Sequence, residues 1–173
     1  MSLHIIIDGY NLIRRSASLS SVELNSLEEG REALIRRLAK YKRFKAHGIT
    51  VVFDGTQSSN PSGRKSRVSG IEIIFSRPGE LADSVIKRLA AREGQRAVVV
   101  TSDREVSDYA QRHGAAIIGS EEFERRMAMA AELDVAADTE DDDIGWRPTT
   151  KKKGPARRRS KRERRIRTRT KKL

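Results

Sequence analysis

The sequence predicts an α/β protein, a three-layer sandwich around a mainly parallel five-stranded sheet, with a basic C-terminal tail. Five short apolar runs alternate with segments of helical periodicity, which is typical of parallel sheets covered by helices. Several of these runs stop at an acidic turn, such as Asp8-Gly9 or Asp54-Gly55. Beyond residue 133 the apolar periodicity gives way to charged residues, so we expect residues 134–173 to be disordered when free.

The five predicted strands are near-continuous apolar runs, as expected of strands buried on both faces of a sheet. They cover residues 3–7, 50–53, 71–75, 97–101 and 115–118. Ser26 with Glu29 predicts a capping box for a helix that runs toward His47-Gly48, and helical spacing predicts further helices over 81–93, 104–113 and 120–133. Residues 55–70 have loop composition with three bases, and a loop of this length inside a domain is more often functional or mobile than inert.

The net charge of +12 is unevenly distributed over the 173 residues. Residues 147–173 hold 15 Lys/Arg and one Glu, residues 134–146 hold six acids and no base, and residues 1–133 hold 21 bases and 17 acids. We therefore expect a folded domain over 1–133, an acidic linker over 134–146 and a basic disordered tail over 147–173. The tail has no aromatic residue, so it offers phosphate neutralisation without base readout.

Composition excludes several classes of protein. Without cysteine there is no disulfide framework, cysteine-ligated zinc site or catalytic thiol, and the three histidines are scattered along the chain. The first residues lack the charged start and apolar core of a signal peptide, and no apolar run approaches the ~20 residues of a membrane span. We expect a cytoplasmic protein with no membrane partner.

Acidic residues recur at the predicted carboxyl ends of strands. Asp8, Asp54 and Asp103 follow three strands directly, and Asp83 lies in the first turn of a predicted helix after a fourth. Ligands of parallel α/β sheets bind at this edge, where converging carboxylates repel unless cations lie among them. An all-oxygen cluster favours Mg²⁺ or Mn²⁺. The alternative is that each Asp serves only as a turn or helix-cap residue.

Other phosphate chemistries are tested by their motifs. The sequence contains no P-loop, no Rossmann fingerprint and no nucleophile elbow. A phosphatase with an aspartyl nucleophile would have a second Asp two residues after Asp8, where this chain has Tyr10. A metal-dependent hydrolytic site therefore fits the sequence better than these alternatives.

The stretch Ile6-Ile7-Asp8-Gly9-Tyr10-Asn11-Leu12-Ile13 resembles the signature of the NYN-domain family of PIN-like ribonucleases, most closely its YacP-like branch. Three companion motifs follow in the expected order: 51–55, 80–83 and 99–105. The resemblance covers residues 3–133, which makes 1–133 the predicted nuclease domain, and implies a PIN-like fold with metal-dependent endonucleolytic cleavage of RNA. The motif at 80–83 has Leu81 where the family pattern has a small hydroxyl residue.

Carried over residue by residue, the resemblance implies that the matching acids are metal ligands. These ligands are Asp8, Asp54, Asp83 and Asp103, with Asn11 as a further polar ligand or orienting group. Asp8, Asp83 and Asp103 are the expected catalytic residues, and Thr101 and Ser102 supply hydroxyls around them. Such a site uses metal ions, not a protein nucleophile, to activate water and stabilise charge on phosphorus.

Six basic side chains are expected to line the RNA path, with solvated surface charge as the alternative for each. They are Arg14, Arg15, Arg64, Lys65, Arg67 and Arg104. The first interpretation is thus a metal-dependent endoribonuclease whose tail tethers it to mRNA, rRNA or the ribosome. A second is a non-catalytic RNA- or ribosome-binding accessory protein, and a third is a small-molecule phosphohydrolase, against which the tail argues.

Overall fold

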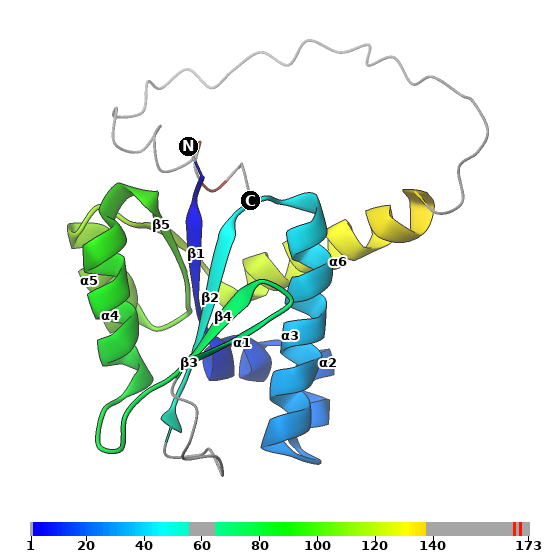
Figure 1. Ribbon diagram of the computed structural model, residues 1–173, viewed down its shortest axis with the longest axis horizontal. Helices are drawn as coiled ribbons and strands as arrows, with labels where there is room; N and C mark the ends of the chain where they lie inside the picture. The colour runs from blue at the N-terminus through cyan, green and yellow to red at the C-terminus, as the bar shows by residue number, and fades with distance from the viewer. Residues whose placement is uncertain (1, 56–64, 138–167, 169, 171–173) are drawn as a thin grey trace.

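Six strands form one sheet in the order β3-β4-β2-β1-β5-β6 in the computed structural model, which describes residues 2–55, 65–137, 168 and 170 (Figure 1). Every neighbouring pair is parallel except β3 with β4. The strands are β1 (His4–Asp8), β2 (Gly48–Phe53), β3 (Lys65–Val68), β4 (Ile71–Phe75), β5 (Ala97–Val100) and β6 (Ala116–Ile118). The mixed α/β fold with its mainly parallel sheet is therefore confirmed.

Helices cover both faces of the sheet and make three layers (Figure 1). One face carries α1 (Gly9–Arg15), α2 (Ala17–Glu23), α3 (Leu27–Phe44) and α6 (Ser120–Ala137). The other face carries α4 (Ala82–Glu93) and α5 (Arg104–Arg112), with a 3₁₀ turn at Gly94–Arg96 before β5. In the described part of the chain, no helix is both long enough and apolar enough to cross a membrane.

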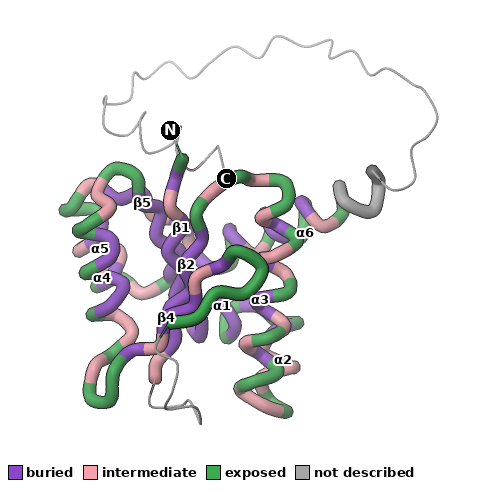
Figure 2. The backbone as a smooth tube through the Cα atoms, viewed as in Figure 1, coloured by how far each residue is buried: buried purple, intermediate pink, exposed green. Residues whose placement is uncertain are grey.

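The central strands are buried on both faces (Figure 2). Alternate residues of β1 point to opposite sides of the sheet, so Ile5 and Ile7 join the core beneath α3 and α6 while Ile6 joins the core beneath α4 and α5. This two-sided burial explains why the strands appear in the sequence as continuous apolar runs rather than as an alternating pattern.

Strand β3 corrects the predicted count of five strands. Residues 55–70 are not all loop, because Lys65–Val68 pair antiparallel with β4 at the sheet edge. Ser69 and Gly70 both have positive φ, 51° and 75°, which is the geometry of a tight two-residue hairpin turn. All four residues of β3 are exposed, so this edge strand has no apolar pattern to reveal it.

Two short helices also precede the first predicted helix. Asp8 caps α1 by accepting a hydrogen bond from the Asn11 N–H, and Ser16 caps α2 by accepting one from Leu19. The predicted Ser26 cap of α3 is confirmed, since its hydroxyl accepts hydrogen bonds from the backbone of Glu28 and Glu29. Helix α6 continues to Ala137, into the start of the predicted acidic linker. Most of that linker and nearly all of the predicted tail lie outside the described residues.

The order of connections places a crevice between β1 and β5. The chain leaves β1 toward the α1–α3 face, whereas it leaves β5 toward α5 on the opposite face. Neighbouring strands whose connections diverge in this way open a cleft at their carboxyl ends, where parallel α/β proteins bind ligands. Asp8 closes β1 and Asp103 follows β5, so two predicted site residues flank this crevice.

Candidate functional site

A pocket of about 440 Å³ lies at the carboxyl ends of β1, β2 and β5 and at the start of α4. It brings together the four aspartates that are the expected metal ligands, although they come from distant parts of the chain. The lining residues are Asp8, Tyr10, Asn11, Arg14, Arg15, Asp54, Leu81, Ala82, Asp83 and Asp103. We refer to it as the acidic pocket.

Asp8 is the most buried of the four acids, with 8% of its surface exposed. Its Oδ1 accepts a hydrogen bond from the Asn11 backbone at 3.2 Å, and its Oδ2 accepts one from the Thr101 hydroxyl at 3.4 Å. Burial raises the pKa of Asp8 to about 6, and the negative charges of Asp83 and Asp103 add to this rise while the two hydrogen bonds oppose it. Without a cation, the pocket therefore disfavours the ionised form of Asp8.

The other three acids approach Asp8 from separate elements. Asp103 caps α5, its Oδ1 accepting a hydrogen bond from the Val106 backbone at 2.9 Å. The pKa of Asp83, in the first turn of α4, is raised first by burial and then by the charge of Asp103, with a smaller contribution from Asp54. Each of the four carboxylates thus belongs to one electrostatically connected group.

The donor set of the acidic pocket fits a hard divalent cation. Four carboxylates line the same pocket, and oxygen is the ligand atom that Mg²⁺ and Mn²⁺ prefer. Over residues 2–55 and 65–137, no three carboxylate or imidazole groups are grouped tightly enough to hold an ion as they stand. The negative charges of the four carboxylates repel one another, and a cation bound among them would reduce this repulsion.

Hydroxyl and amide groups hold the loops around the acids. Thr101 accepts a hydrogen bond from the Asp103 backbone at 3.0 Å while donating to Asp8, so it links the ends of β1 and β5. Asn11 Oδ1 accepts two hydrogen bonds, from the Ser102 N–H at 3.0 Å and from the Ser120 hydroxyl at 2.7 Å. These bonds occupy both lone pairs of the amide oxygen and tie the start of α1 to the residues that follow β5 and β6.

Ser120 is a site residue that the sequence analysis does not identify. It is fully buried at the start of α6, its hydroxyl donates to Asn11, and its N–H donates to the Ser102 hydroxyl at 3.4 Å. In the sequence it indicates only a helix start. The available signal is its position directly after β6 and Gly119, which is the same strand-end placement that identifies the aspartates.

Tyr10 also has a defined place, as a brace between two parts of the fold. Only 5% of its surface is exposed, its ring packs edge-on against Phe53 at 5.1 Å, and its hydroxyl accepts a hydrogen bond from Arg31 at 2.9 Å. Gly9 is required beside it, because a Cβ there would lie 2.3 Å from the Phe53 ring. The Asp-Gly-Tyr-Asn signature therefore encodes close packing as well as site residues.

The predicted RNA-binding residues are only partly brought together. Arg14 and Arg15 line the acidic pocket with more than half of each side chain exposed, although they lie 3.7 Å from Glu23 and 3.9 Å from Glu121. Arg104 is exposed at the start of α5, next to Asp103. Arg14 and Arg15 therefore border the aspartates, whereas Arg104 follows Asp103 in the chain without lining the pocket.

Of the remaining three candidates the structure describes two, Lys65 and Arg67, and neither lines the acidic pocket. Lys65 opens β3 opposite Ile74, near the carboxyl end of β4. Arg67 instead lines a separate cavity of about 410 Å³ with His4, Gly48 and Glu72, at the amino ends of the parallel strands. The aspartates lie at the carboxyl ends of these strands, so Arg67 does not join them. Arg64 lies outside the described residues.

Leu81 is the residue at which the motif at 80–83 departs from the family pattern. It occupies the cap position of α4, where no side-chain hydrogen bond closes the helix start, and it lines the acidic pocket with 64% of its surface exposed. An apolar side chain thus stands beside Asp83 where the related motif would supply a hydroxyl.

Known proteins resemble this chain in sequence and in fold. Residues 5–170 match the model of the YacP-like NYN domain. A curated relative, the uncharacterized protein YacP of Bacillus subtilis (strain 168), is 34% identical over 86 residues, which is 50% of this chain and 50% of that protein. The chain thus matches about half the length of this curated relative.

Two solved structures share the fold. The crystal structure of Rae1 (YacP) from Bacillus subtilis superposes with a TM-score of 0.66 at 27% identity, over 79% of each chain. A tryptophan-to-leucine mutant of the same protein gives a TM-score of 0.65 at 27% identity, over 82% of this chain and 86% of that one. From the family match over nearly its whole length, we conclude that the chain belongs to the family of YacP-like NYN domains, a family whose members are generally nucleases.

Proposed function

We propose that this protein is a divalent-metal-dependent endoribonuclease that hydrolyses RNA phosphodiester bonds in the acidic pocket. The observation that carries the proposal is the convergence of Asp8, Asp54, Asp83 and Asp103 on one pocket at the crevice between β1 and β5. The raised pKa values of Asp8 and Asp83 support it, because they belong to carboxylates that a cation would stabilise. Family membership supports the nuclease class.

The proposed roles follow from position. Asp8, Asp83 and Asp103 would hold Mg²⁺ or Mn²⁺, with Asp54 completing the set and Asn11, Thr101 and Ser102 keeping the loops in place. When bound, the metal would activate water and neutralise charge on the transferring phosphate. Within the described residues, the pocket lining includes no Ser, Cys or His, which favours water over a protein side chain as the nucleophile.

Two groups of basic side chains would hold the RNA, one beside the acidic pocket and one in the C-terminal tail. Arg14 and Arg15 border the acidic pocket, where their guanidinium groups can neutralise phosphates on either side of the reacting one. Residues 147–173, with 15 bases and one acid and so a net charge of +14, would tether the enzyme to mRNA, rRNA or the ribosome through the phosphate backbone alone.

The proposal is tested by incubating the full chain with total RNA and mapping the new 5′ ends with and without Mg²⁺ or Mn²⁺. Wild type is expected to give discrete ends only with the metal, and Asp8→Asn to give none while it still folds and binds RNA. Asp108→Asn is the matched control, because Asp108 lies on α5 outside the pocket lining. RNA binding without metal-dependent ends would instead favour a non-catalytic accessory protein.

A further inference from the structure

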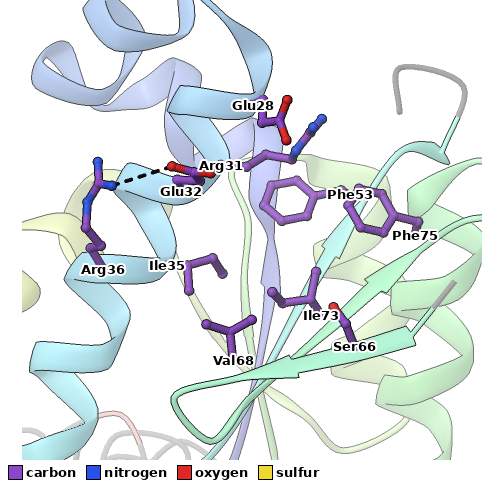
Figure 3. A pocket seen from close by; sticks show the side chains of 10 residues that line it. All are labelled: Glu28, Arg31, Glu32, Ile35, Arg36, Phe53, Ser66, Val68, Ile73 and Phe75. Carbon is purple, nitrogen blue, oxygen red and sulfur yellow. Dashed lines mark ion pairs between the residues drawn. The ribbon is translucent and has the colours of Figure 1, made fainter. Parts of the chain in front are cut away.

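A second pocket, of about 490 Å³, lies between α3 and the β3–β4 hairpin and plays no part in the proposed chemistry (Figure 3). We call it the α3–β4 slot. Its apolar lining consists of Ile35 on α3, Phe53 on β2, Val68 on β3, and Ile73 and Phe75 on β4. A pocket of this volume lies within the range that binds small organic groups.

The slot has two facing apolar walls. Ile35 forms one wall, while Val68 and Ile73 form the other, across the opening in Figure 3. Phe53 and Phe75 close one end, their rings stacked at 5.7 Å with an interplanar angle of 28°. Val68 has 46% of its surface exposed, a large fraction for an apolar side chain. A flat apolar or aromatic group would fill this shape and cover that surface.

The polar groups of the slot suit the edge of a base better than a phosphate. Arg31 lies over the Phe75 ring at 5.6 Å, beside Glu28, and the next turn of α3 carries Glu32 and Arg36 paired at 3.6 Å (Figure 3). The two carboxylates cancel the two guanidinium charges, so the lining does not attract an anion. It does offer both hydrogen-bond donors and acceptors, as the edge of a nucleobase requires.

The slot is joined to the acidic pocket through two shared contacts. Tyr10 lines the acidic pocket, and its ring packs against Phe53 of the slot at 5.1 Å. Arg31 of the slot donates a hydrogen bond to the Tyr10 hydroxyl at 2.9 Å. The two cavities are therefore neighbours, separated by the side chains of Tyr10 and Phe53.

We propose that the α3–β4 slot binds one unpaired nucleobase of a single-stranded RNA whose backbone crosses the acidic pocket. Proteins that recognise single-stranded RNA stack splayed-out bases on aromatic side chains and guanidinium planes, and the slot offers the Arg31 guanidinium plane beside the Phe53–Phe75 ring pair. The inference rests on the proposed function and extends it, because it assigns a base subsite to the same substrate. It also implies a requirement for single-stranded RNA next to the cut.

The test compares Val68→Glu with Leu24→Glu in the full chain. Both residues are exposed and apolar, so the changes are equal in charge and should be tolerated, but only Val68 lines the slot. Binding of a short single-stranded RNA is measured without divalent ions, with each position in turn replaced by an abasic nucleotide. This readout needs no cleavage, so it is independent of whether the acidic pocket is catalytic.

One abasic position is expected to weaken binding to wild type by about 10- to 100-fold, the contribution of one stacked base. Val68→Glu should weaken binding of the intact RNA to a similar extent and should remove the effect of that abasic position, while Leu24→Glu should behave as wild type. Photo-crosslinking with 4-thiouridine should label the slot residues. Equal binding by the two variants, or crosslinks confined to other residues, would overturn the proposal.

Discussion

Asp8 performs two tasks that make opposite demands on its carboxylate. As the cap of α1 it stabilises the helix start, and at the acidic pocket it is buried beside other acids. The position of this residue can be predicted from the sequence, because a strand-ending Asp is recognisable. Its burial and its link to Thr101 cannot, since both depend on how β1 lies beside β5.

Replacing the Asp8 carboxylate by an amide, in Asp8→Asn, is expected to stabilise the protein in metal-free buffer. The pKa of Asp8 is about 6 in the folded state, above its ordinary value of 3.8. Ionisation of Asp8 therefore destabilises the folded state fully above about pH 6, and it has no effect at low pH, where Asp8 is protonated in both the folded and the unfolded state. The gain in unfolding free energy should be about 2–3 kcal/mol at about pH 7.5 and should shrink as the pH falls from about 6 toward about 4. Asn also caps helices well.

Urea unfolding of wild type and Asp8→Asn across this pH range, with a chelator present, measures the effect. Asp108→Asn provides the control, because Asp108 lies outside the acidic pocket and has no such burial to relieve. A gain that does not change with pH, or a loss of stability at neutral pH, would show that burial does not disfavour the Asp8 anion.

Among the secondary-structure elements, the buried strands could be predicted and the exposed edge strand could not. Each of the five parallel strands carries a run of apolar residues, so each can be identified from its own sequence without knowing which strands pair with it. Strand β3 has the sequence Lys-Ser-Arg-Val and is held by pairing with β4, so its only local signal is the Ser69-Gly70 turn. The α3–β4 slot could not be predicted for the same reason, because part of its wall belongs to β3.

Helix α6 is expected to contribute strongly to stability through Phe123. This side chain is fully buried and packs edge-on against Tyr41 of α3 at 5.3 Å. Phe123→Ala should lower the free energy of unfolding by about 3–5 kcal/mol, because it removes a large core side chain and leaves a cavity. Because α6 also positions Ser120, activity should fall as well.

Met129→Ala on the same helix is the matched control for Phe123→Ala. With 64% of its surface exposed, Met129 should cost no more than about 0.5 kcal/mol when truncated. Chemical denaturation of both variants measures the difference. Similar losses for the two would mean that α6 is not anchored through its buried face.

Across the molecule as a whole, the net charge of +12 divides into a domain of +4, from 21 bases and 17 acids, a linker of −6, from six acids, and a C-terminal arm of +14, from 15 bases and one acid. We propose that these parts act separately, the domain supplying the acidic pocket and the arm supplying affinity. This division of charge could be predicted from the sequence, because the net charge of a segment depends only on its composition. The arrangement of the arginines could not be predicted from the sequence. Arg14 and Arg15 line the acidic pocket at the carboxyl ends of the strands, whereas Arg67 lies at the amino ends.

This division predicts how RNA binding depends on salt. Affinity of the full chain for RNA should fall steeply between about 50 and 200 mM salt, because each neutralised phosphate releases counterions. A chain ending at residue 146 should bind more weakly and with a much shallower salt dependence. Filter binding without divalent ions measures both, and equal slopes for the two chains would contradict a tethering role for the arm.

The proposed metal-dependent chemistry is tested most directly by the cleavage rate of an end-labelled RNA with wild type, Asp83→Asn and Asp108→Asn over a titration of Mn²⁺. We predict metal-dependent cleavage by wild type and Asp108→Asn. We predict a loss of about 100-fold or more for Asp83→Asn, whose residue lines the acidic pocket. Cleavage by Asp83→Asn at the wild-type rate, or no dependence of the wild-type rate on the metal, would contradict the proposed function.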